Sequence, residues 1–150
     1  MATVHATCLV VDGTGVLLRG EPGCGKSDLA LRAMDAGCAM LVADDRVELA
    51  PCDGAELWAA PPPALAGLIE VRGLGIVRRS YRRRARVRLV VDLVPREAVE
   101  RLPEQRRVAI AGVELPLHSL WAFDLSALAK LRTAVRHAVA ACGWEGSLDG

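Results

Sequence analysis

The residues with the most evident chemical potential lie close together near the start of the chain. Gly20–Ser27 reads Gly-Glu-Pro-Gly-Cys-Gly-Lys-Ser, which has the G-x-x-x-x-G-K-[ST] spacing of a phosphate-binding loop, or P-loop. Glycines let the backbone approach a ligand closely, and successive N–H groups can then surround an anion. Lysine neutralises phosphate charge, and the serine hydroxyl can bind Mg²⁺. The pattern predicts a nucleotide-binding or phosphate-binding site made of Gly20, Glu21, Pro22, Gly23, Cys24, Gly25, Lys26 and Ser27, with Ser27 also a metal ligand.

The residues on either side of this loop have the patterns that a P-loop needs. Residues 14–19 form a short apolar run, and residues 27–34 place apolar side chains at helical spacing. Strand, glycine loop and helix is the arrangement in which this motif binds phosphate. The chain contains only two lysines, Lys26 and Lys130, among nineteen basic residues. A lysine at the motif's fixed position therefore favours the functional interpretation over a chance glycine turn.

A second group of chemical interest follows the loop closely. Met40, Leu41, Val42 and Ala43 form an apolar run that ends on two carboxylates, Asp44 and Asp45. In open α/β sheets, ligands bind at the carboxyl ends of the strands. Because neighbouring residues of a strand point to opposite faces, we expect at most one of the two to face the phosphates, unless the strand ends between them. The proximity of the P-loop favours a catalytic role over an ordinary Asp-Asp turn.

Length and composition limit the class of protein. We expect residues 1–150 to form a single domain, because 150 residues suffice for a sizeable core. A content of 52% apolar and 25% charged residues, with a net charge of +1, is typical of a globular domain and gives no overall bias in partners. The five cysteines include no C-x-x-C pair, which predicts reduced thiols in a cytoplasmic protein. The chain shows neither a secretory signal nor an apolar run long enough to span a membrane.

Hairpin signals between apolar runs predict how the sheet is built. The sequence predicts an α/β fold, a P-loop-containing mixed β-sheet with hairpins and flanking helices. An all-parallel sheet is excluded because the strands expected at residues 46–49 and 56–59 are joined by a short turn. The other expected elements are strands at 2–12, 14–19, 40–43 and 86–94, a hairpin at 108–115, a helix that follows the P-loop and ends at Gly37, and a helix at 126–142.

One stretch is strongly basic. Residues 78–88 hold seven arginines, which could be a solvated edge or a surface for an acidic partner or for nucleic acid. Its single aromatic residue, Tyr81, offers little for stacking on bases, which argues against nucleic acid. The preceding stretch, Glu70-Val71-Arg72-Gly73-Leu74-Gly75-Ile76, contains a G-x-G that does not continue to G-x-x-G. It is therefore not a dinucleotide-binding fingerprint.

Three local motifs, in this order and spacing, resemble the HPr kinase/phosphorylase family. They are Gly25-Lys26-Ser27-Asp28, Leu41-Val42-Ala43-Asp44-Asp45-Arg46-Val47 and the stretch from Glu70 to Ile76. The last is close to that family's signature and is far more specific than a P-loop alone. The resemblance covers residues 2 to about 94 well and the remainder loosely. It extends to the catalytic domain alone, as in the short members of the family that lack the amino-terminal domain.

The resemblance implies an enzyme that phosphorylates a serine of HPr, the small phosphocarrier of the sugar phosphotransferase system. Members use ATP with Mg²⁺, and many also use pyrophosphate. They can remove the phosphate again with inorganic phosphate, releasing pyrophosphate. By position, Asp44 resembles the general base, Asp45 a support for that base or for the metal, and Ser27 and Glu70 the Mg²⁺ ligands. His5 matches a histidine near the family's active site. The resemblance also implies a homo-oligomer, a hexamer in the family.

Two stretches depart from the family pattern: Leu115–Leu120, and the loop after the Glu70–Ile76 signature, which is short and arginine-rich here. Two other functions remain as alternatives. Leu115–Leu120 lacks the glycine and arginine that longer members carry there, so the resemblance implies the kinase more firmly than the phosphorylase. The first alternative is a P-loop kinase of a small molecule, with Arg78–Arg84 as its lid. The second is a nucleotide-binding regulatory NTPase, or a regulator with no transferase activity.

Overall fold

A mixed sheet is the frame of the protein. The computed structural model describes residues 1–141, so the predicted helix end at Cys142 lies outside the described part. The strands are β1 (Ala2–His5), β2 (Thr7–Val11), β3 (Thr14–Arg19), β4 (Ala39–Ala43), β5 (Arg46–Cys52), β6 (Glu56–Ala60), β7 (Leu68–Val71), β8 (Gly75–Arg78), β9 (Ala85–Leu93), β10 (Arg106–Ile110) and β11 (Val113–Leu120). The helices are α1 (Lys26–Asp35) and α2 (Ala127–Ala141), with short 3₁₀ turns at Pro63–Leu65 and Arg96–Ala98.

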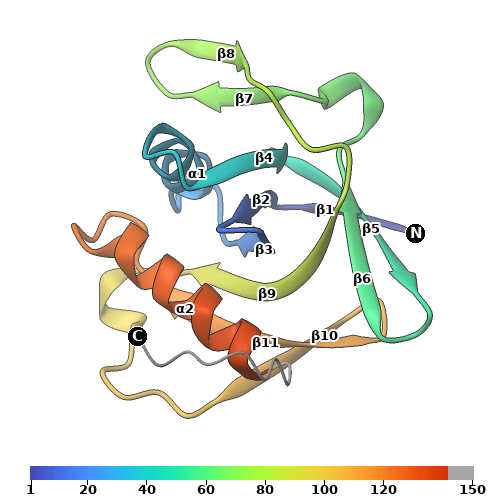
Figure 1. Cartoon of the computed structure of the whole chain (residues 1–150). Helices are drawn as coiled ribbons and strands as arrows, with labels where there is room; N and C mark the ends of the chain where they lie inside the picture. The colour runs from blue at the N-terminus through green and yellow to red at the C-terminus, as the bar shows by residue number, and fades with distance from the viewer. Residues whose placement is uncertain (142–150) are drawn as a thin grey trace.

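The sheet has nine strands and forks at its longest one. Its main order is β1-β5-β6-β9-β3-β2-β4 (Figure 1). The first residues of β9 pair with β6, whereas its last residues pair with β11, which in turn carries β10. The β3–β9 and β9–β11 pairs are parallel, whereas β2–β3, β5–β6 and β10–β11 are antiparallel hairpins. The prediction of a mixed sheet with hairpins is confirmed, and the fork at β9 is an addition to it.

The curled sheet buries both of its faces, and the helices cover one of them. Alternate residues of β2, β3 and β9 pack against α1 and α2, as Leu9, Leu18 and Val91 do. The intervening residues, such as Cys8 and Leu17, pack in a second core with Val47 and Leu57 from the curled part of the sheet. This double burial explains why the central strands read as nearly continuous apolar runs.

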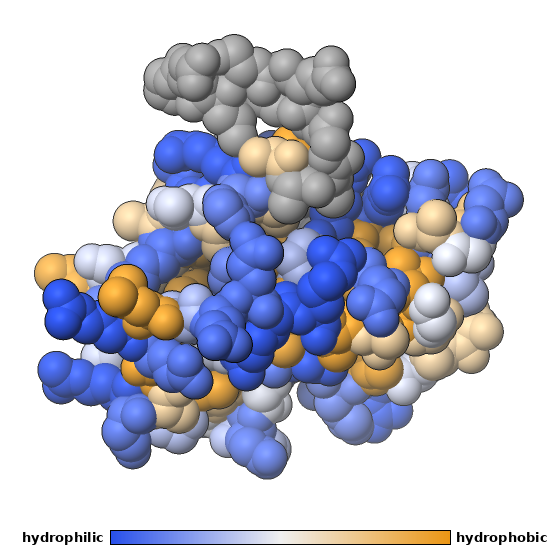
Figure 2. Space-filling model, turned by 90° about the horizontal axis from the view of Figure 1, so that it is seen from below, coloured by the Kyte–Doolittle hydropathy of each residue, from blue (hydrophilic) through white to orange (hydrophobic). Residues whose placement is uncertain are grey.

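The surface differs from these interiors. Seen from below, hydrophilic side chains cover most of the molecule, and apolar residues show between them in separate groups (Figure 2). No helix among residues 1–141 is long and apolar enough to cross a membrane.

Helix α1 ends where the sequence predicted. Gly37 has φ 79°, a left-handed conformation that glycine adopts without steric cost. Its N–H donates to the carbonyl of Met34 at 3.0 Å, and the N–H of Cys38 donates to the carbonyl of Ala33 at 3.2 Å. These two bonds make a Schellman motif, which ends the helix and turns the chain into β4.

Gly15 is required where β3 meets β9. A Cβ added there would lie 2.0 Å from the backbone carbonyl oxygen of Arg86, at a point where the strand register shifts. We expect Gly15→Ala to push the two strands apart and to lower the free energy of unfolding by about 2–4 kcal/mol. Urea unfolding of the variant would measure this.

Gly54→Ala is the control for that prediction. Gly54 has φ 70° but open space around its Cα, so its replacement should cost only the backbone strain, about 1 kcal/mol. Equal losses in the two variants would contradict the predicted clash.

Candidate active site

The Gly20–Ser27 loop joins β3 to α1, as the sequence predicted. Gly25 precedes the helix with φ 99°, and a Cβ on it would lie 2.7 Å from the Cβ of Ala122. Gly25 is thus needed both for its backbone conformation and for the close approach of the segment before α2. The loop is closed by a hydrogen bond from the N–H of Cys24 to the carbonyl of Glu21, at 3.0 Å.

Lys26 lies along its own loop. Its Nζ donates to the carbonyl of Gly20 at 2.8 Å and to that of Glu21 at 3.3 Å, and lies 3.6 Å from the Sγ of Cys24. The two carbonyls are solvent-exposed. The ammonium group is therefore held next to the backbone that would surround an anion.

Asp44 is the most connected polar residue of the site. Its side chain is buried, with 5% of the residue exposed. Oδ1 accepts hydrogen bonds from the hydroxyls of Thr7 and Ser27, each at 2.8 Å, and Oδ2 accepts one from the N–H of Glu70 at 3.2 Å. The donors come from β2, α1 and β7, and Asp44 itself follows β4. One carboxylate thus connects four elements that are distant in the sequence.

Asp45 has a different environment. Strand β4 ends at Ala43, before both aspartates, and Asp45 has φ 70°. Its side chain is 70% exposed, 3.9 Å from the Nδ1 of His5 and 4.0 Å from the Nε of Arg46. Contacts of this length between exposed groups contribute little to stability. Because the strand stops before the pair, Asp44 and Asp45 can both border the same cleft. The expectation that at most one of them faces the phosphates stays a prediction.

The two aspartates and the Gly20–Ser27 loop border a cleft of about 460 Å³. Of the predicted site residues, the structure brings to it Pro22, Gly23, Gly25, Lys26, Ser27, Asp44, Asp45 and Glu70. Gly20, Glu21 and Cys24 belong to the loop but do not line the cleft, and His5 touches the site only through Asp45.

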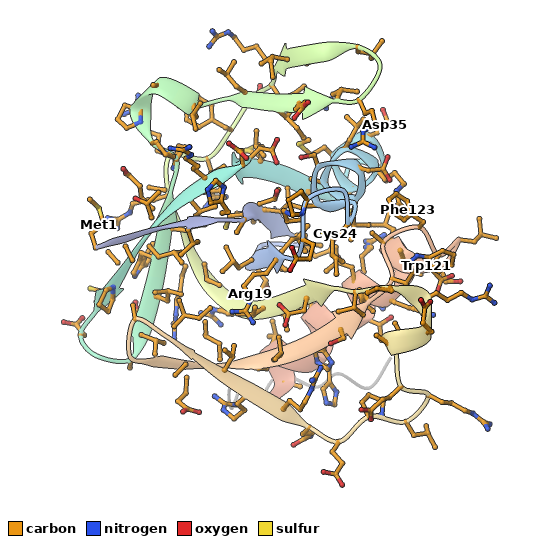
Figure 3. All side chains as sticks on the ribbon, turned by 180° about the vertical axis from the view of Figure 1, so that it is seen from behind. Met1, Arg19, Cys24, Asp35, Trp121 and Phe123 are labelled. Carbon is orange, nitrogen blue, oxygen red and sulfur yellow. The ribbon has the colours of Figure 1, made fainter. Side chains whose placement is uncertain are left out.

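Six further residues line the cleft that the motifs did not identify as site residues: Thr7, Asp28, Leu31, Val71, Arg72 and Phe123. Thr7 holds Asp44 from β2, Arg72 follows β7, and Phe123 lies on the segment between β11 and α2. Phe123 is seen beside the loop that carries Cys24 (Figure 3). Arg72 belongs to the stretch that resembles a family signature, whereas Thr7 and Phe123 reach the site only through the fold.

Comparison with known proteins assigns the family. The model of the HPr serine kinase C-terminal domain matches residues 1–135. The chain belongs to this family. The resemblance predicted from three motifs is thereby confirmed, and the match extends well beyond residue 94.

Individual relatives agree with the family match. The HPr kinase/phosphorylase of Bordetella petrii is 42% identical over 113 residues, which cover 69% of this chain and 36% of that protein. The one of Cupriavidus necator is 38% identical over 126 residues, or 77% of this chain and 38% of that protein. The chain thus spans little more than a third of the length of these relatives.

A solved structure shows the same fold over nearly its full length. The HPr(Ser) kinase/phosphatase from Coxiella burnetii is 29% identical to this chain. It superposes with a TM-score of 0.83, covering 95% of this chain and 99% of that one. Sequence family and three-dimensional fold therefore agree.

The donor atoms of the cleft suit a hard cation. Ser27 offers a hydroxyl and Glu70 a carboxylate, the oxygen ligands that Mg²⁺ prefers. Within residues 1–141 no three His, Cys, Asp or Glu residues gather closely enough to hold a metal by themselves. A metal in this cleft would therefore complete its shell with water and phosphate oxygens, as Mg²⁺ usually does.

Asp92, near the carboxyl end of β9, is not a candidate metal ligand of this cleft. β9 runs parallel to β3 and also carries an aspartate near its carboxyl end, Asp92. The carboxylate of Asp92 accepts hydrogen bonds from Arg19, from Nε at 2.8 Å and from a terminal nitrogen at 3.2 Å. Asp92 therefore neutralises Arg19 and is not among the residues that line the cleft.

Proposed function

We propose that this chain transfers the terminal phosphoryl group of ATP to a serine hydroxyl of HPr. Membership of the HPr serine kinase family supports this proposal. The observation that carries it is the buried Asp44 carboxylate, which joins the Ser27 hydroxyl of the glycine loop to the cleft. Phosphoryl transfer needs little more than positioned phosphates, a metal and a positioned nucleophile, and this cleft can provide all three.

Each side chain has a defined task in this proposal. Lys26 leaves its loop carbonyls and pairs with the phosphates. The Ser27 hydroxyl donates a hydrogen bond to Asp44, which leaves an oxygen lone pair free for Mg²⁺. Ser27 and Glu70 would hold the metal. Mg²⁺, when bound, neutralises charge on the phosphate oxygens.

Asp44 acts in this proposal as the general base. Among residues 1–141, its Oδ2 accepts one hydrogen bond, from the Glu70 N–H at 3.2 Å. It therefore retains a lone pair that can take the serine proton as the serine oxygen attacks the phosphorus. ADP leaves with the electrons of the broken P–O bond. In the phosphorylase direction, an oxygen of inorganic phosphate would attack the phosphorus of phosphoserine and the bond from phosphorus to the serine oxygen would break. Asp44 would return the proton to that serine oxygen, and pyrophosphate would be released as the product. Asp45, exposed at the rim, supports the base or the metal.

The test is direct. The purified chain is incubated with Mg²⁺, ATP and HPr, and mass spectrometry of HPr should show one added phosphoryl group on a serine. HPr with that serine changed to alanine, and a reaction with EDTA, should show none. Transfer from ATP to a metabolite in place of HPr would favour the small-molecule kinase instead. ATP binding with no transfer to any acceptor would favour a regulator.

The basic stretch is proposed as the surface that meets the partner protein. Arg82, Arg83 and Arg84 are exposed and do not line the cleft. The guanidinium carbon of Arg84 lies 4.5 Å from the centre of the Trp58 ring. Arg84 therefore packs against a side chain of β6. Changing all three to alanine should weaken HPr binding about tenfold at low salt and flatten its salt dependence, as isothermal titration at several salt concentrations would show.

Arg106 and Arg107 provide the matched control for this prediction. They are exposed arginines on β10, the outer strand of the branch that β11 and β10 form from β9, and changing both to alanine should leave HPr binding nearly unaltered. A loss of ATP affinity in the triple variant would identify the stretch as a nucleotide lid instead. Assembly into a homo-oligomer, which the family resemblance implies, stays a prediction.

A further inference from the structure

Phe123 is an aromatic residue that the proposed chemistry leaves without a task. It is the only phenylalanine of the chain, is 53% exposed and lines the cleft with the Gly20–Ser27 loop. Its ring packs on the start of α1, since a Cβ on Gly25 would lie 3.0 Å from its Cζ and 3.3 Å from its Cε1. The edge of the Phe123 ring that carries Cζ and Cε1 therefore contacts the loop, while much of the rest of the ring is open to solvent.

The segment that carries Phe123 is held firmly. Ala122 is fully buried, and its carbonyl accepts a hydrogen bond from the guanidinium of Arg32 on α1. The Asp124 carboxylate accepts hydrogen bonds from the Ser126 N–H at 2.9 Å and from the Lys130 Nζ at 2.5 Å. The bonds from Lys130 and Ser126 also lower the pKa of Asp124. The ring is therefore presented in one place rather than on a loose loop.

The segment that carries Phe123 and the hairpin that carries Glu70 lie at opposite sides of the cleft's helix. The β7–β8 hairpin, which carries Glu70, and the segment before α2, which carries Phe123, lie on either side of α1 (Figure 1). The reacting phosphate must lie near Asp44 and Ser27. The remaining phosphates follow the loop back from Ser27 toward Gly25, where the N–H groups before α1 can bind them, and Gly25 is the residue on which Phe123 packs. A nucleotide in this orientation brings its adenosine out of the loop beside Phe123.

We infer that Phe123 is a specificity residue, which stacks on the base of the bound nucleotide and so favours ATP over donors that have phosphates alone. The inference rests on the proposed function, because it assumes a nucleotide in the cleft. Flat aromatic bases stack on phenylalanine rings with useful affinity. The ring adds nothing for pyrophosphate or tripolyphosphate, which the loop, Lys26 and the metal would bind alone.

Two probes with the same phosphates test the inference. Dissociation constants for ATP and for inorganic tripolyphosphate, each with Mg²⁺, are measured by isothermal titration on the wild-type chain and on Phe123→Ala, without HPr. ATP should bind about tenfold more weakly to the variant, as expected when one stacked base loses its partner, whereas tripolyphosphate should change less than twofold. Phe123→Leu, which keeps an apolar contact on Gly25, should lose ATP affinity in the same selective way.

Leu125→Ala is the control, because Leu125 is fully exposed on the same segment and does not line the cleft. Both affinities should be unchanged in it. Equal weakening of ATP and tripolyphosphate in Phe123→Ala would overturn the inference, because the ring would then only support the loop. Unchanged affinity for both, with weaker HPr binding, would also overturn it and make Phe123 a protein contact. A wild-type chain that binds ATP selectively yet never phosphorylates HPr would overturn the proposed function alone.

Discussion

Replacing Asp44 with asparagine should lower the rate of phosphoryl transfer to HPr by about 10²–10⁴-fold, the usual loss when a general base is removed. The amide is nearly the same size as the carboxylate, and its oxygen can still accept the hydroxyls of Thr7 and Ser27. It cannot take up the serine proton. The fold and the affinity for Mg²⁺ and ATP should persist, as circular dichroism and titration would show, while a rapid-quench assay measures transfer.

The substitution has one predictable cost. The new Nδ2 would face the N–H of Glu70, which now donates to Oδ2 at 3.2 Å, so one hydrogen bond is lost. We expect stability to fall by about 1–2 kcal/mol on that account, which a small folded domain tolerates.

Asp45→Asn is the control, because Asp45 borders the same cleft but is largely exposed and lacks the contact with Ser27. Its effect on transfer should be the smaller of the two. If Asp44→Asn transferred phosphate at nearly the wild-type rate, the assignment of the base would be wrong. A larger loss in Asp45→Asn would move the role of base to Asp45.

Local signals were enough to predict the parts of the site that neighbouring residues determine. The loop before α1 follows from glycines at fixed spacing, and the helix end at Gly37 follows from the need for a left-handed residue. Hairpins such as β5–β6 follow from short turns between alternating runs. In each case the cause and the structure lie within a few residues of each other, so the sequence alone carries the information.

Contacts between distant segments could not be predicted in this way. Thr7 and Asp44 are 37 positions apart, and they meet because β2 pairs with β4. Phe123 reaches the loop only because β11 joins the fork of the sheet at β9. The position of Asp45 depends on β4 stopping at Ala43, whereas alternation along a continuing strand would have turned it away. Which strands pair, and where each strand ends, depend on the whole fold and cannot be predicted from a single motif.

Lys26→Met should impair nucleotide binding as well as transfer, unlike the change at Asp44. The lysine charge acts on the phosphates in the ground state and in the transition state alike. Methionine keeps the apolar stem and removes the ammonium, which now lies 2.8 Å from the carbonyl oxygen of Gly20. We expect ATP and tripolyphosphate to bind at least about tenfold more weakly, and transfer to fall by about 10²–10³-fold.

The pattern across probes separates this loss from those expected at the other positions. Lys26→Met should weaken ATP and tripolyphosphate equally, Phe123→Ala should weaken ATP alone, and Asp44→Asn should weaken neither. Lys26→Arg tests whether charge alone suffices. Because the planar guanidinium is wider than the ammonium that now fits between the Gly20 and Glu21 carbonyls, we expect it to restore only part of the binding. Wild-type affinity for both ligands in Lys26→Met would show that the phosphates do not contact Lys26, and the phosphate-binding role of the loop would then be wrong.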